Sequence, residues 1–360
     1  MEKLRAAVVG ATGVVGQQFI VALQSHPWFE IACLAASERS AGKSYGEALR
    51  DERTGAFRWF CDETPFDYVL DVPVENADKI DVGGLDVVFS AVEADVAVEL
   101  EPKFAKTTPV ISTASAFRYD VDVPILVPGV NSAQAEIISV QRRKRGWKGF
   151  ISPIPNCTTT GMVITLKPLY DRFGIDCVVM TSMQALSGAG RSPGVVALDI
   201  LDNVIPYIPK EEEKVQMETL KILGRYAGGR ITPADIRLSC TCTRVNVMDG
   251  HTEAVFVNTK KGCSVEEAEE AFKSFGSDLA GLKLPSAPER MIVVNDDPFR
   301  PQPRLDRNTC DGMATTVGRI RKDAVFEKGI KYVLVSHNTK MGAAKGAVLV
   351  AEYLNKTGYI

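Results

Sequence analysis

The chain has 360 residues, of which 45% are hydrophobic and 24% are charged, and its net charge at pH 7 is -3. This charge gives no general attraction to nucleic acid or to an anionic membrane surface. No apolar run approaches the roughly 18 to 20 residues that a transmembrane helix needs, and the first residues show no signal-peptide pattern. A chain of this length exceeds one ordinary hydrophobic core, so we expect two domains.

The cysteines and histidines narrow the possible chemistry. The 8 cysteines show no zinc-like spacing, and the two nearest to each other are Cys240 and Cys242. Reduced thiols in a cytoplasmic protein without a metal site are the simplest account. Only 3 histidines are present, His26, His251 and His337, so a histidine that acts as acid or base must be one of these.

The N-terminal segment has the pattern of a dinucleotide-binding turn. Residues 4–9 read as a buried strand that runs into Gly10-Ala-Thr-Gly-Val-Val-Gly16, and Phe19, Ile20 and Leu23 then recur at helical spacing. Such glycines let the backbone approach a pyrophosphate that faces the start of the helix. The spacing is GxxGxxG rather than GxGxxG, and a tight strand–helix turn without a ligand is the alternative.

The loop after the second strand favours NADP over NAD. Residues 30–35 read as that strand, and an NAD site usually has an acidic residue at its end for the ribose hydroxyls. Here Ser37, Arg39 and Lys43 offer a hydroxyl and two cations for a 2′-phosphate. Glu38 would oppose this phosphate if it pointed inward, and a solvated position in the loop is the alternative.

The alternation of strands and helices continues. Residues 85–91 and 109–112 read as strands, with a helix over 94–106 between them. This order predicts a doubly wound parallel sheet, which binds ligands beyond the carboxyl ends of its strands. Arg118 lies in the loop after the strand over 109–112, and we therefore expect it at the edge of the sheet that binds ligands. An ordinary surface charge is the alternative. The basic run over 141–148 has one tryptophan, and we interpret it as a solvated helix end rather than a nucleic-acid patch.

Cys157 lies in the most informative segment, Ser152-Pro-Ile-Pro-Asn-Cys-Thr-Thr-Thr-Gly161. We expect a helix to begin near Thr158, capped by these hydroxyl residues, with its N–H groups and positive end directed at the sulfur. That environment favours a thiolate and supplies donors for an oxyanion. The alternative is a small buried hydrophobic residue, which describes most cysteines outside disulfides.

The segments after Cys157 alternate again between strand and helix patterns. A strand around 177–183 precedes a glycine-rich loop over 184–191. Residues 199–206 have the pattern of an amphipathic helix, and a longer helix begins at Glu211 and reaches Leu223. The glycine-rich loop suits close approach of the backbone to a ligand, although a plain surface turn has the same composition.

Arg244-Val-Asn-Val-Met-Asp-Gly-His251 is the second informative segment. Val245 and Val247 alternate as in a strand that presents Arg244 and, after the Asp-Gly turn, His251. Arginine binds a carboxylate through two hydrogen bonds, and histidine moves a proton near neutral pH. A histidine after glycine is also common as a structural or exposed residue.

Taken in order, these segments resemble the aspartate-semialdehyde dehydrogenase family, in particular its archaeal and fungal branch. The specific matches are Pro155-Asn-Cys-Thr158, Gln184-Ala-Leu-Ser-Gly-Ala-Gly190, Asp199-Ile-Leu-Asp-Asn-Val-Ile-Pro206, Arg244 to His251, and Arg300-Pro-Gln-Pro-Arg-Leu-Asp-Arg307. The resemblance implies an α/β chain with a Rossmann-type dinucleotide-binding domain and an α+β catalytic and dimerisation domain, similar to glyceraldehyde-3-phosphate dehydrogenase. It implies a first domain over 1–155, completed by a C-terminal helix over 338–360, and a second over 156–337.

The resemblance also implies an activity, the NADPH-dependent reductive dephosphorylation of L-aspartyl-4-phosphate to L-aspartate-4-semialdehyde. This reaction is a step toward lysine, methionine and threonine. Cys157 would be the nucleophile that forms a thioacyl intermediate, and His251 would be the acid/base. Gln184 would position the acyl-enzyme, and Asn156 completes the catalytic set.

The remaining implied residues bind substrate and cofactor. Arg244 and Glu211 would hold the substrate carboxylate and amino group, with Glu212 in place of Glu211 if the match shifts by one residue. Lys214 and Arg118 match the phosphate-binding cations of the family. The NADP contacts would be Gly10, Thr12, Gly13, Val14, Val15, Gly16, Ser37, Arg39, Ser187, Gly188, Ala189, Gly190, Arg191 and Asn338.

Three other functions fit part of the pattern. A malonyl-CoA or succinyl-CoA reductase shares the cysteine, the histidine, the arginine and the Ser-Gly-Ala-Gly loop, but Asn156, Glu211 and Lys214 favour aspartyl phosphate. An N-acetyl-glutamyl-phosphate reductase is a more distant relative by architecture. A non-catalytic NADP-binding regulator would have no need of Cys157, His251 and Arg244 together. The expected partners are a small-molecule substrate and further copies of the chain, as a homodimer or homotetramer, with no nucleic acid, membrane or metal.

Overall fold

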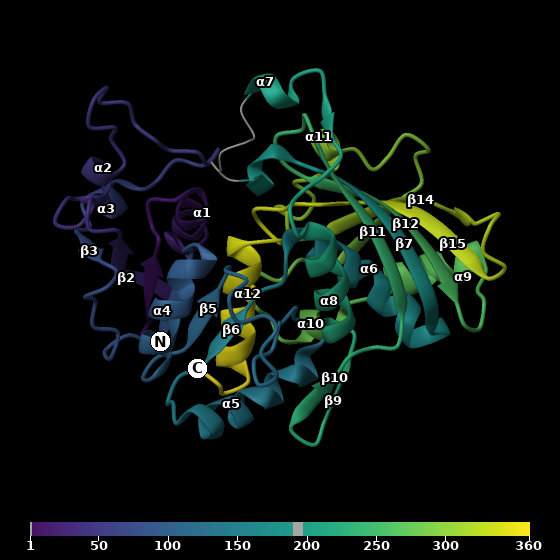
Figure 1. Cartoon of the computed structure of the whole chain (residues 1–360), viewed down its shortest axis with the longest axis horizontal. Helices are drawn as coiled ribbons and strands as arrows, with labels where there is room; N and C mark the ends of the chain where they lie inside the picture. Colours follow the sequence, from purple (N-terminus) through teal and green to yellow (C-terminus); the bar gives the residue numbers. More distant parts are fainter. Residues whose placement is uncertain (1, 190–196) are drawn as a thin grey trace. The chain divides into compact units, whose positions relative to one another are not determined.

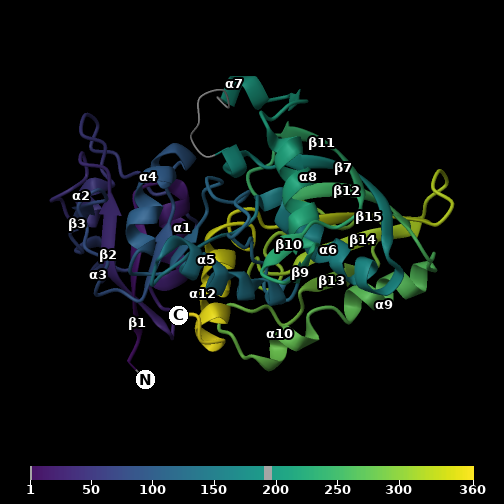
Figure 2. The same ribbon diagram turned by 60° about the horizontal axis from the view of Figure 1, so that its bottom comes forward.

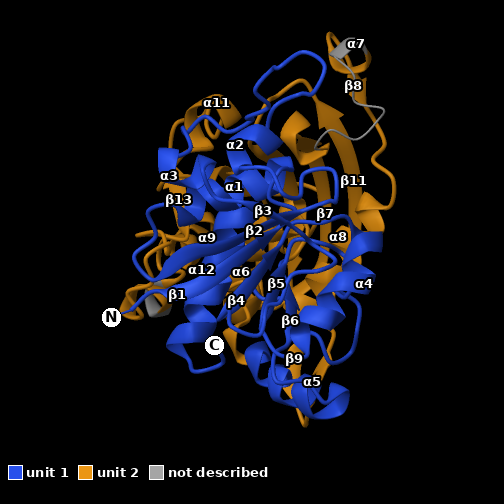
Figure 3. Ribbon diagram, turned by 90° about the vertical axis from the view of Figure 1, so that its left-hand side faces the viewer, with its two compact units in different colours: residues 1–126, 134–154, 343–360 blue, residues 127–133, 155–342 orange. Residues whose placement is uncertain are grey.

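The structure is a computed structural model that describes residues 2–189 and 197–360. The chain divides into two compact units. Unit 1 comprises residues 1–126, 134–154 and 343–360, and unit 2 comprises residues 127–133 and 155–342 (Figures 1 and 3). Within the described residues, no helix is both long and apolar enough to cross a membrane.

Unit 1 is built on a six-stranded parallel sheet with the strand order β3-β2-β1-β4-β5-β6. The strands are β1 (Leu4–Val9), β2 (Phe29–Ala36), β3 (Val74–Asn76), β4 (Val87–Ser90), β5 (Val110–Ser112) and β6 (Ile151–Pro153). The order reverses between β1 and β4, which is where such sheets bind a ligand beyond their carboxyl ends. This is the doubly wound arrangement that the sequence predicts.

Helices cover both faces of this sheet. They are α1 (Val14–Leu23), α2 (Tyr45–Ala48), α3 (Asp67–Leu70), α4 (Ala94–Ala105), α5 (Ile137–Arg145) and α12 (Ala344–Lys356). On one face, Val8 of β1 shares a hydrophobic core with Phe19 of α1 and Val348 of α12. On the other face, Val9 shares a core with Phe104 of α4. Consecutive residues of β1 therefore point to opposite cores, as in a strand buried on both sides.

Unit 2 is built on a seven-stranded mixed sheet with the order β13-β14-β15-β12-β7-β11-β8. Its strands are β7 (Ile175–Gln184), β8 (Val204–Ile205), β11 (Arg237–Val245), β12 (His251–Thr259), β13 (Ile292–Asn295), β14 (Thr315–Lys322) and β15 (Gly329–Ser336), and a separate hairpin is formed by β9 (Arg225–Ala227) and β10 (Arg230–Thr232). Its helices are α6 (Cys157–Phe173), α7 (Ala197–Ile200), α8 (Glu211–Ile222), α9 (Val265–Lys273), α10 (Ser277–Gly281) and α11 (Pro303–Asp306).

The two faces of this sheet have different surroundings. Along β12, alternate residues from His251 to Thr259 are buried, and the residues between them are half-buried. Helices α6, α8 and α9 pack on the buried face, and Figure 2 shows α6 and α9 alongside the strands. The sheet thus has one covered face, which faces the start of α6, and one more exposed face.

One expected helix is wrong. Residues 199–206 do not form a single amphipathic helix, because α7 ends at Ile200 and Asp202 has a φ of 54°. β8 follows, and its Ile205 pairs with Arg244 of β11 in antiparallel register. A left-handed residue interrupts a helix, and the strand pairing then satisfies the backbone groups of Val204 and Ile205.

Candidate active site

Cys157 is the first residue of α6, one position earlier than the helix start that the sequence predicts. The expected cap is also wrong: the Oδ1 atom of Asn156 accepts hydrogen bonds from the N–H groups of Thr158 at 2.9 Å and Thr159 at 3.3 Å. Among the described residues, neither threonine hydroxyl has a hydrogen-bond partner. Asn156 therefore caps α6, and two of the expected oxyanion donors are already occupied. The sulfur keeps its place at the positive end of the helix.

His251 contacts this sulfur. The distance from Cys157 Sγ to His251 Nε2 is 3.1 Å, and the N–H of Ala185 donates to His251 Nδ1 at 3.0 Å. Because Nδ1 accepts a hydrogen bond, the proton of the neutral ring lies on Nε2 and points at the sulfur. A second proton on Nδ1 would face the N–H of Ala185, so this contact disfavours the imidazolium.

The surroundings of His251 act in the same direction. Its side chain is fully buried at the start of β12. Burial, and then the electrostatic effects of Arg244 and His337, lower the pKa of His251 to about 3. The imidazole is therefore neutral at physiological pH and serves as a hydrogen-bond donor to the sulfur.

Arg244 lies on β11 beside Gln184 of β7, because the two strands pair in parallel register at these residues. Its Nη1 donates to the carbonyl oxygen of Ala185 at 2.8 Å. Burial lowers the pKa of Arg244, and the nearby charges of Cys157 and Glu211 partly offset this. The guanidinium is thus buried, fixed by the backbone of Ala185 and close enough to Cys157 to feel its charge, which suits a carboxylate-binding group.

Gly188 lies against both His251 and Arg244. A Cβ atom at this position would come within 2.9 Å of His251 Cε1 and 3.0 Å of Arg244 Nη1. Gly342 plays a similar part on another side, since its Cβ would come within 2.9 Å of Cys157 Cβ. Sequence reasoning included Gly188 and missed Gly342, whose proximity arises only when the end of unit 2 folds back.

Two glutamates of α8 hold Asn156. Glu211 accepts a hydrogen bond from Asn156 Nδ2 at 2.9 Å, and Glu218 accepts one from the backbone N–H of Asn156 at 2.6 Å. Glu212 instead accepts from the N–H of Cys242, so it is Glu211 that faces the cysteine turn. Glu218 was missed by sequence reasoning. Its signal is the seven-residue spacing from Glu211, which brings both side chains to one face of the helix.

The other candidates of unit 2 flank this cluster. Gln184 is buried and donates to Ser182 Oγ at 3.2 Å, and Lys214 is half-buried one turn after Glu211. Asn338 donates to Ser187 Oγ at 2.7 Å and accepts from the N–H of Gly250 at 2.8 Å. Asn338 thus joins the Ser187 turn to the turn before His251. Gly188 and Ala189 complete this turn, whereas Gly190 and Arg191 lie outside the described residues.

The glycine turn of unit 1 has the geometry that a pyrophosphate needs. Gly10 has a φ of 83°, and a Cβ there would meet the backbone oxygen of Ala91 at 2.5 Å. A Cβ on Gly16 would meet Gly10 O at 2.2 Å. Gly13 is the N-cap of α1 and has no side chain to bond the N–H groups at the helix start. Thr12, Val14 and Val15 lie in the same turn, and these residues fit a dinucleotide.

The residues expected at a 2′-phosphate follow β2. Ser37 and Arg39 are both exposed just beyond the end of this strand. Glu38 is exposed as well, which fits its alternative as a solvated loop residue. Lys43 donates to Glu52 at 2.9 Å and is thus already engaged. Ser37 and Arg39 remain the better candidates for a 2′-phosphate.

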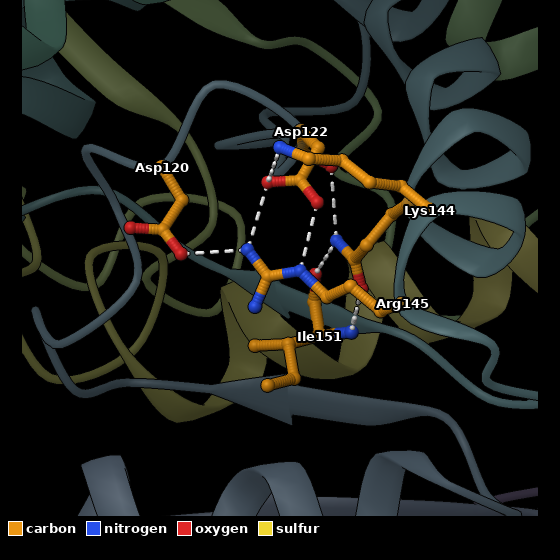
Figure 4. A network of polar contacts seen from close by, with 6 residues as sticks. Asp120, Asp122, Lys144, Arg145 and Ile151 are labelled. Atoms are coloured by element: carbon orange, nitrogen blue, oxygen red, sulfur yellow. Dashed lines mark hydrogen bonds and ion pairs between the residues drawn. The ribbon is translucent and has the colours of Figure 1, made fainter.

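Arg118 is buried in the loop after β5, where its Nη2 donates to the carbonyl oxygen of Thr113 at 2.9 Å. The basic run over 141–148 contains the end of α5, as the sequence suggests, and Arg143, Lys144 and Lys148 are exposed, but two of its residues are not solvated. Gln141 is fully buried, and Arg145 forms ion pairs with Asp120 and Asp122, the residues that follow Arg118 (Figure 4). The carboxylates that attract Arg145 come from a loop more than 20 residues earlier, so the local sequence does not reveal them.

Two family models match successive parts of the chain. A family model described as "Semialdehyde dehydrogenase, NAD binding domain" matches residues 5–138, and one described as "Semialdehyde dehydrogenase, dimerisation domain" matches residues 166–341. These matches support the expected α/β class with a Rossmann-type domain, which is confirmed.

Full-length relatives are also similar. Aspartate-semialdehyde dehydrogenase from Archaeoglobus fulgidus is 50% identical, with 97% of each chain covered, and that from Methanothermobacter thermautotrophicus is 47% identical, with 98% of this chain and 99% of the relative covered. A crystal structure of aspartate-semialdehyde dehydrogenase with NADP from Candida albicans is 40% identical, with a TM-score of 0.89 over 100% of both chains.

Proposed function

The chain belongs to the aspartate-semialdehyde dehydrogenase family, and we propose that it reduces L-aspartyl-4-phosphate to L-aspartate-4-semialdehyde and phosphate with NADPH. This reaction is a step in the biosynthesis of lysine, methionine and threonine. The observation that carries the proposal is the 3.1 Å contact between Cys157 Sγ and His251 Nε2 at the start of α6. The relatives named above give no support to the malonyl-CoA or succinyl-CoA alternative.

Cys157 is the proposed nucleophile. Its thiolate attacks the acyl carbon, a C–S bond forms, and the C–O bond to phosphate breaks, so that phosphate leaves as a stable anion. The product is a thioester on Cys157, which accepts a hydride more readily than a carboxylate does. NADPH, when bound, supplies that hydride.

His251, which the sequence suggests as the acid/base, is proposed to act as a neutral hydrogen-bond donor and not to transfer a proton. Its Nε2–H already points at the sulfur, because the Ala185 N–H occupies Nδ1. A hydrogen bond to sulfur stabilises the thiolate both when it attacks and when it is expelled as the aldehyde forms. The same N–H is a donor for the oxyanion that develops next to the C–S bond. Gln184, buried at the end of β7, is proposed to position the acyl group.

Arg244 and Glu211 are the proposed ligands of the substrate's carboxylate and amino group. Both are buried, with opposite charges, and Glu211 is joined to the cysteine turn through Asn156. Lys214 and Arg118 are proposed to bind the phosphate. A malonyl or succinyl group has no amino group, so a substrate of either kind would lack the ammonium that Glu211 is proposed to bind.

NADP is proposed to bind at the glycine turn. The pyrophosphate faces the start of α1, and Ser37 and Arg39 bind the 2′-phosphate. Ser187 to Ala189 and Asn338 are further proposed contacts, as is the pair Gly190 and Arg191. We accordingly assign cofactor binding to residues 1–155 and 338–360, and catalysis to residues 156–337.

Self-association is the remaining expectation. The chain contains a segment that matches a dimerisation domain, and the second face of the unit 2 sheet carries half-exposed and exposed apolar residues such as Val179. These features support a homodimer or homotetramer. All eight cysteines are reduced thiols within the described part of the chain, which supports a reducing compartment such as the cytoplasm.

A side-by-side assay tests the function. The purified chain should reduce NADP when given L-aspartate-4-semialdehyde plus phosphate, and it should show no oxidation of NADPH with malonyl-CoA or succinyl-CoA. The opposite pattern would assign the chain to the CoA-dependent reductases. N-Acetyl-glutamate semialdehyde with phosphate serves as a third substrate, and its preferential use would point to the more distant alternative.

A further inference from the structure

The segment that carries Arg118 is a loop between β5 and α5, and its shape decides where the Arg118 guanidinium lies. Arg118 donates to the carbonyl oxygen of Thr113 in its own segment. At the start of the segment, Ser112 Oγ accepts from the N–H of Ala114 at 3.0 Å and donates to the buried Glu101 at 2.5 Å. The start of the loop is therefore fixed to β5 and α4.

Arg145, the last residue of α5, holds the other half of the loop. Its Nε and Nη2 donate to the two carboxylate oxygens of Asp122, both at 2.7 Å, and Nη2 also donates to Asp120 at 2.6 Å (Figure 4). Its guanidinium carbon lies 5.9 Å from the ring centroid of Phe117. The contacts of Arg145 thus lie on both sides of Arg118 in the sequence.

Arg145 and the end of α5 are themselves held by neighbouring residues. The guanidinium carbon of Arg145 lies 5.1 Å from the ring centroid of Trp147. One helical turn earlier, Gln141 donates to the carbonyl oxygens of Asp122 at 3.1 Å and Ile151 at 3.0 Å, and accepts from the N–H of Ile151 at 2.7 Å. The loop is thereby connected through α5 to strand β6.

An ordinary surface ion pair is the competing explanation. Exposed pairs contribute about 0 to 1 kcal/mol and hold no particular geometry. The Asp122 side chain is only 4% exposed, and Arg145 is 19% exposed and bonds it through two nitrogens. The contact of Arg145 with the buried Asp122 carboxylate therefore fixes the position of the loop. A planar guanidinium that binds both carboxylate oxygens sets the orientation of the carboxylate as well as its distance.

We propose that Arg145 is a positioning residue that sets the loop carrying Arg118 and thereby determines the affinity of the enzyme for inorganic phosphate. The inference rests on the proposed role of Arg118 as a phosphate ligand. Arg145 itself contacts carboxylates, so its effect on phosphate passes through the loop.

The test compares Arg145→Met with Lys144→Met in the direction that consumes phosphate. Lys144 is the matched control because its side chain is 59% exposed and its Nζ is 3.9 Å from Asp122. For Arg145→Met we expect the KM for phosphate to rise about tenfold, with kcat and the KM values for NADP and the semialdehyde within about twofold. Lys144→Met should stay within about twofold in every parameter.

The double variant Arg118→Met/Arg145→Met shows whether Arg145 acts through Arg118. We expect its KM for phosphate to equal that of Arg118→Met alone. If Arg145 acts on phosphate only by positioning Arg118, its replacement has no further effect once Arg118 is gone, so the two effects do not add. Additive effects, or an equal loss in all kinetic parameters of Arg145→Met, would overturn the inference. If Arg145→Met does not fold, Arg145→Lys should still raise the KM for phosphate by a few fold, since lysine cannot make the two-point contact.

The phosphate-binding role of Arg118 and the positioning role of Arg145 are contradicted by different kinetic results. An unchanged KM for phosphate in Arg118→Met would remove the proposed phosphate role of Arg118, and the inference with it. A raised KM in Arg118→Met together with an unchanged KM in Arg145→Met would leave that role intact and overturn the inference alone.

Discussion

The Cys157 site of unit 2 and the glycine turn of unit 1 hold their ligand-facing groups in different ways. Around Cys157 these groups are side chains, and His251 and Arg244 are each fixed by a hydrogen bond to the backbone of Ala185. At the glycine turn they are backbone N–H groups, and Gly16 leaves no space for a side chain. A reaction at Cys157 requires a few charged side chains in fixed positions around the substrate. Binding of a pyrophosphate requires that the backbone N–H groups come close to its oxygens. Substitutions should therefore change turnover in one region, and stability and cofactor affinity in the other.

The largest effect should come from Cys157→Ser. Since the serine hydroxyl is far less acidic than a thiol, kcat should fall at least about 1,000-fold. NADPH affinity, measured by fluorescence titration, should stay within about twofold, because the variant adds no bulk. Substantial residual turnover would mean that another group is the nucleophile.

Glu101→Gln should change stability, because Glu101 is a buried side chain at the ligand edge of unit 1. Burial raises the pKa of Glu101 from 4.5 to about 7, against the opposing effects of Ser112, Ser90 and Arg118. The unfolded chain therefore loses this proton at a lower pH than the native chain does. The native state should lose about 3 kcal/mol of stability as pH rises from about 4.5 to about 7.

Glu101→Gln should remove this part of the pH dependence. Denaturant unfolding of both proteins at pH 5 and pH 8 measures it, and the variant should gain stability relative to the natural chain as pH rises. An equal pH dependence in the two proteins would show that Glu101 is ionised in the native state.

Arg244→Lys tests the side-chain site at a binding residue. A lysine keeps the charge but replaces two parallel hydrogen bonds with one point contact, so the KM for the semialdehyde should rise about 10- to 100-fold. The KM for NADP should not change. Steady-state kinetics with each substrate varied in turn gives both numbers, and equal shifts in the two KM values would argue against a substrate role.

Gly16→Ala and Gly13→Ala form a matched pair within the backbone-built region. A Cβ at position 16 would lie 2.2 Å from Gly10 O, whereas at position 13 its nearest neighbour is the same oxygen at 3.4 Å. We expect Gly16→Ala to cost roughly 2 kcal/mol in unfolding free energy, and Gly13→Ala to cost less than about 1 kcal/mol, which is the N-cap preference for glycine over alanine. Equal stabilities would show that the turn relaxes easily.

Arg39→Ala should have the smallest effect, because Arg39 is exposed beyond β2. An exposed cation paired with a phosphate contributes about 1 kcal/mol, so the KM for NADP should rise by a few fold. The KM for NAD should stay the same. A preference for NAD over NADP in the natural chain would contradict the assignment of Ser37 and Arg39.

Local patterns predicted much of unit 1. The strand over 4–9, the glycine turn and the following helix depend on neighbours in sequence, and β1 has the expected bounds of Leu4–Val9. The family and the α/β class could likewise be inferred, because the motifs around Cys157 and His251 occur in a characteristic order.

Contacts between distant segments could not be predicted. Asn156 caps α6 in place of the expected threonines, because Glu211 and Glu218 of α8 hold its side chain and its N–H. The expected helix over 199–206 gives way to β8, since β11 offers a strand edge. Arg145 is shielded rather than solvated because its carboxylate partners lie in an earlier loop. In each case the residue that makes the contact lies far away in the sequence, so a local sequence pattern cannot predict it.

Release of phosphate in the absence of NADPH tests the thioacyl intermediate most directly. On mixing with L-aspartyl-4-phosphate, the natural chain should release a burst of phosphate stoichiometric with active sites, and hydroxylamine should discharge the adduct from Cys157. Cys157→Ser provides the background of spontaneous hydrolysis. If phosphate appears only when NADPH is present, with no adduct on Cys157, then no acyl-enzyme forms before reduction and the account given for Cys157 and His251 is wrong.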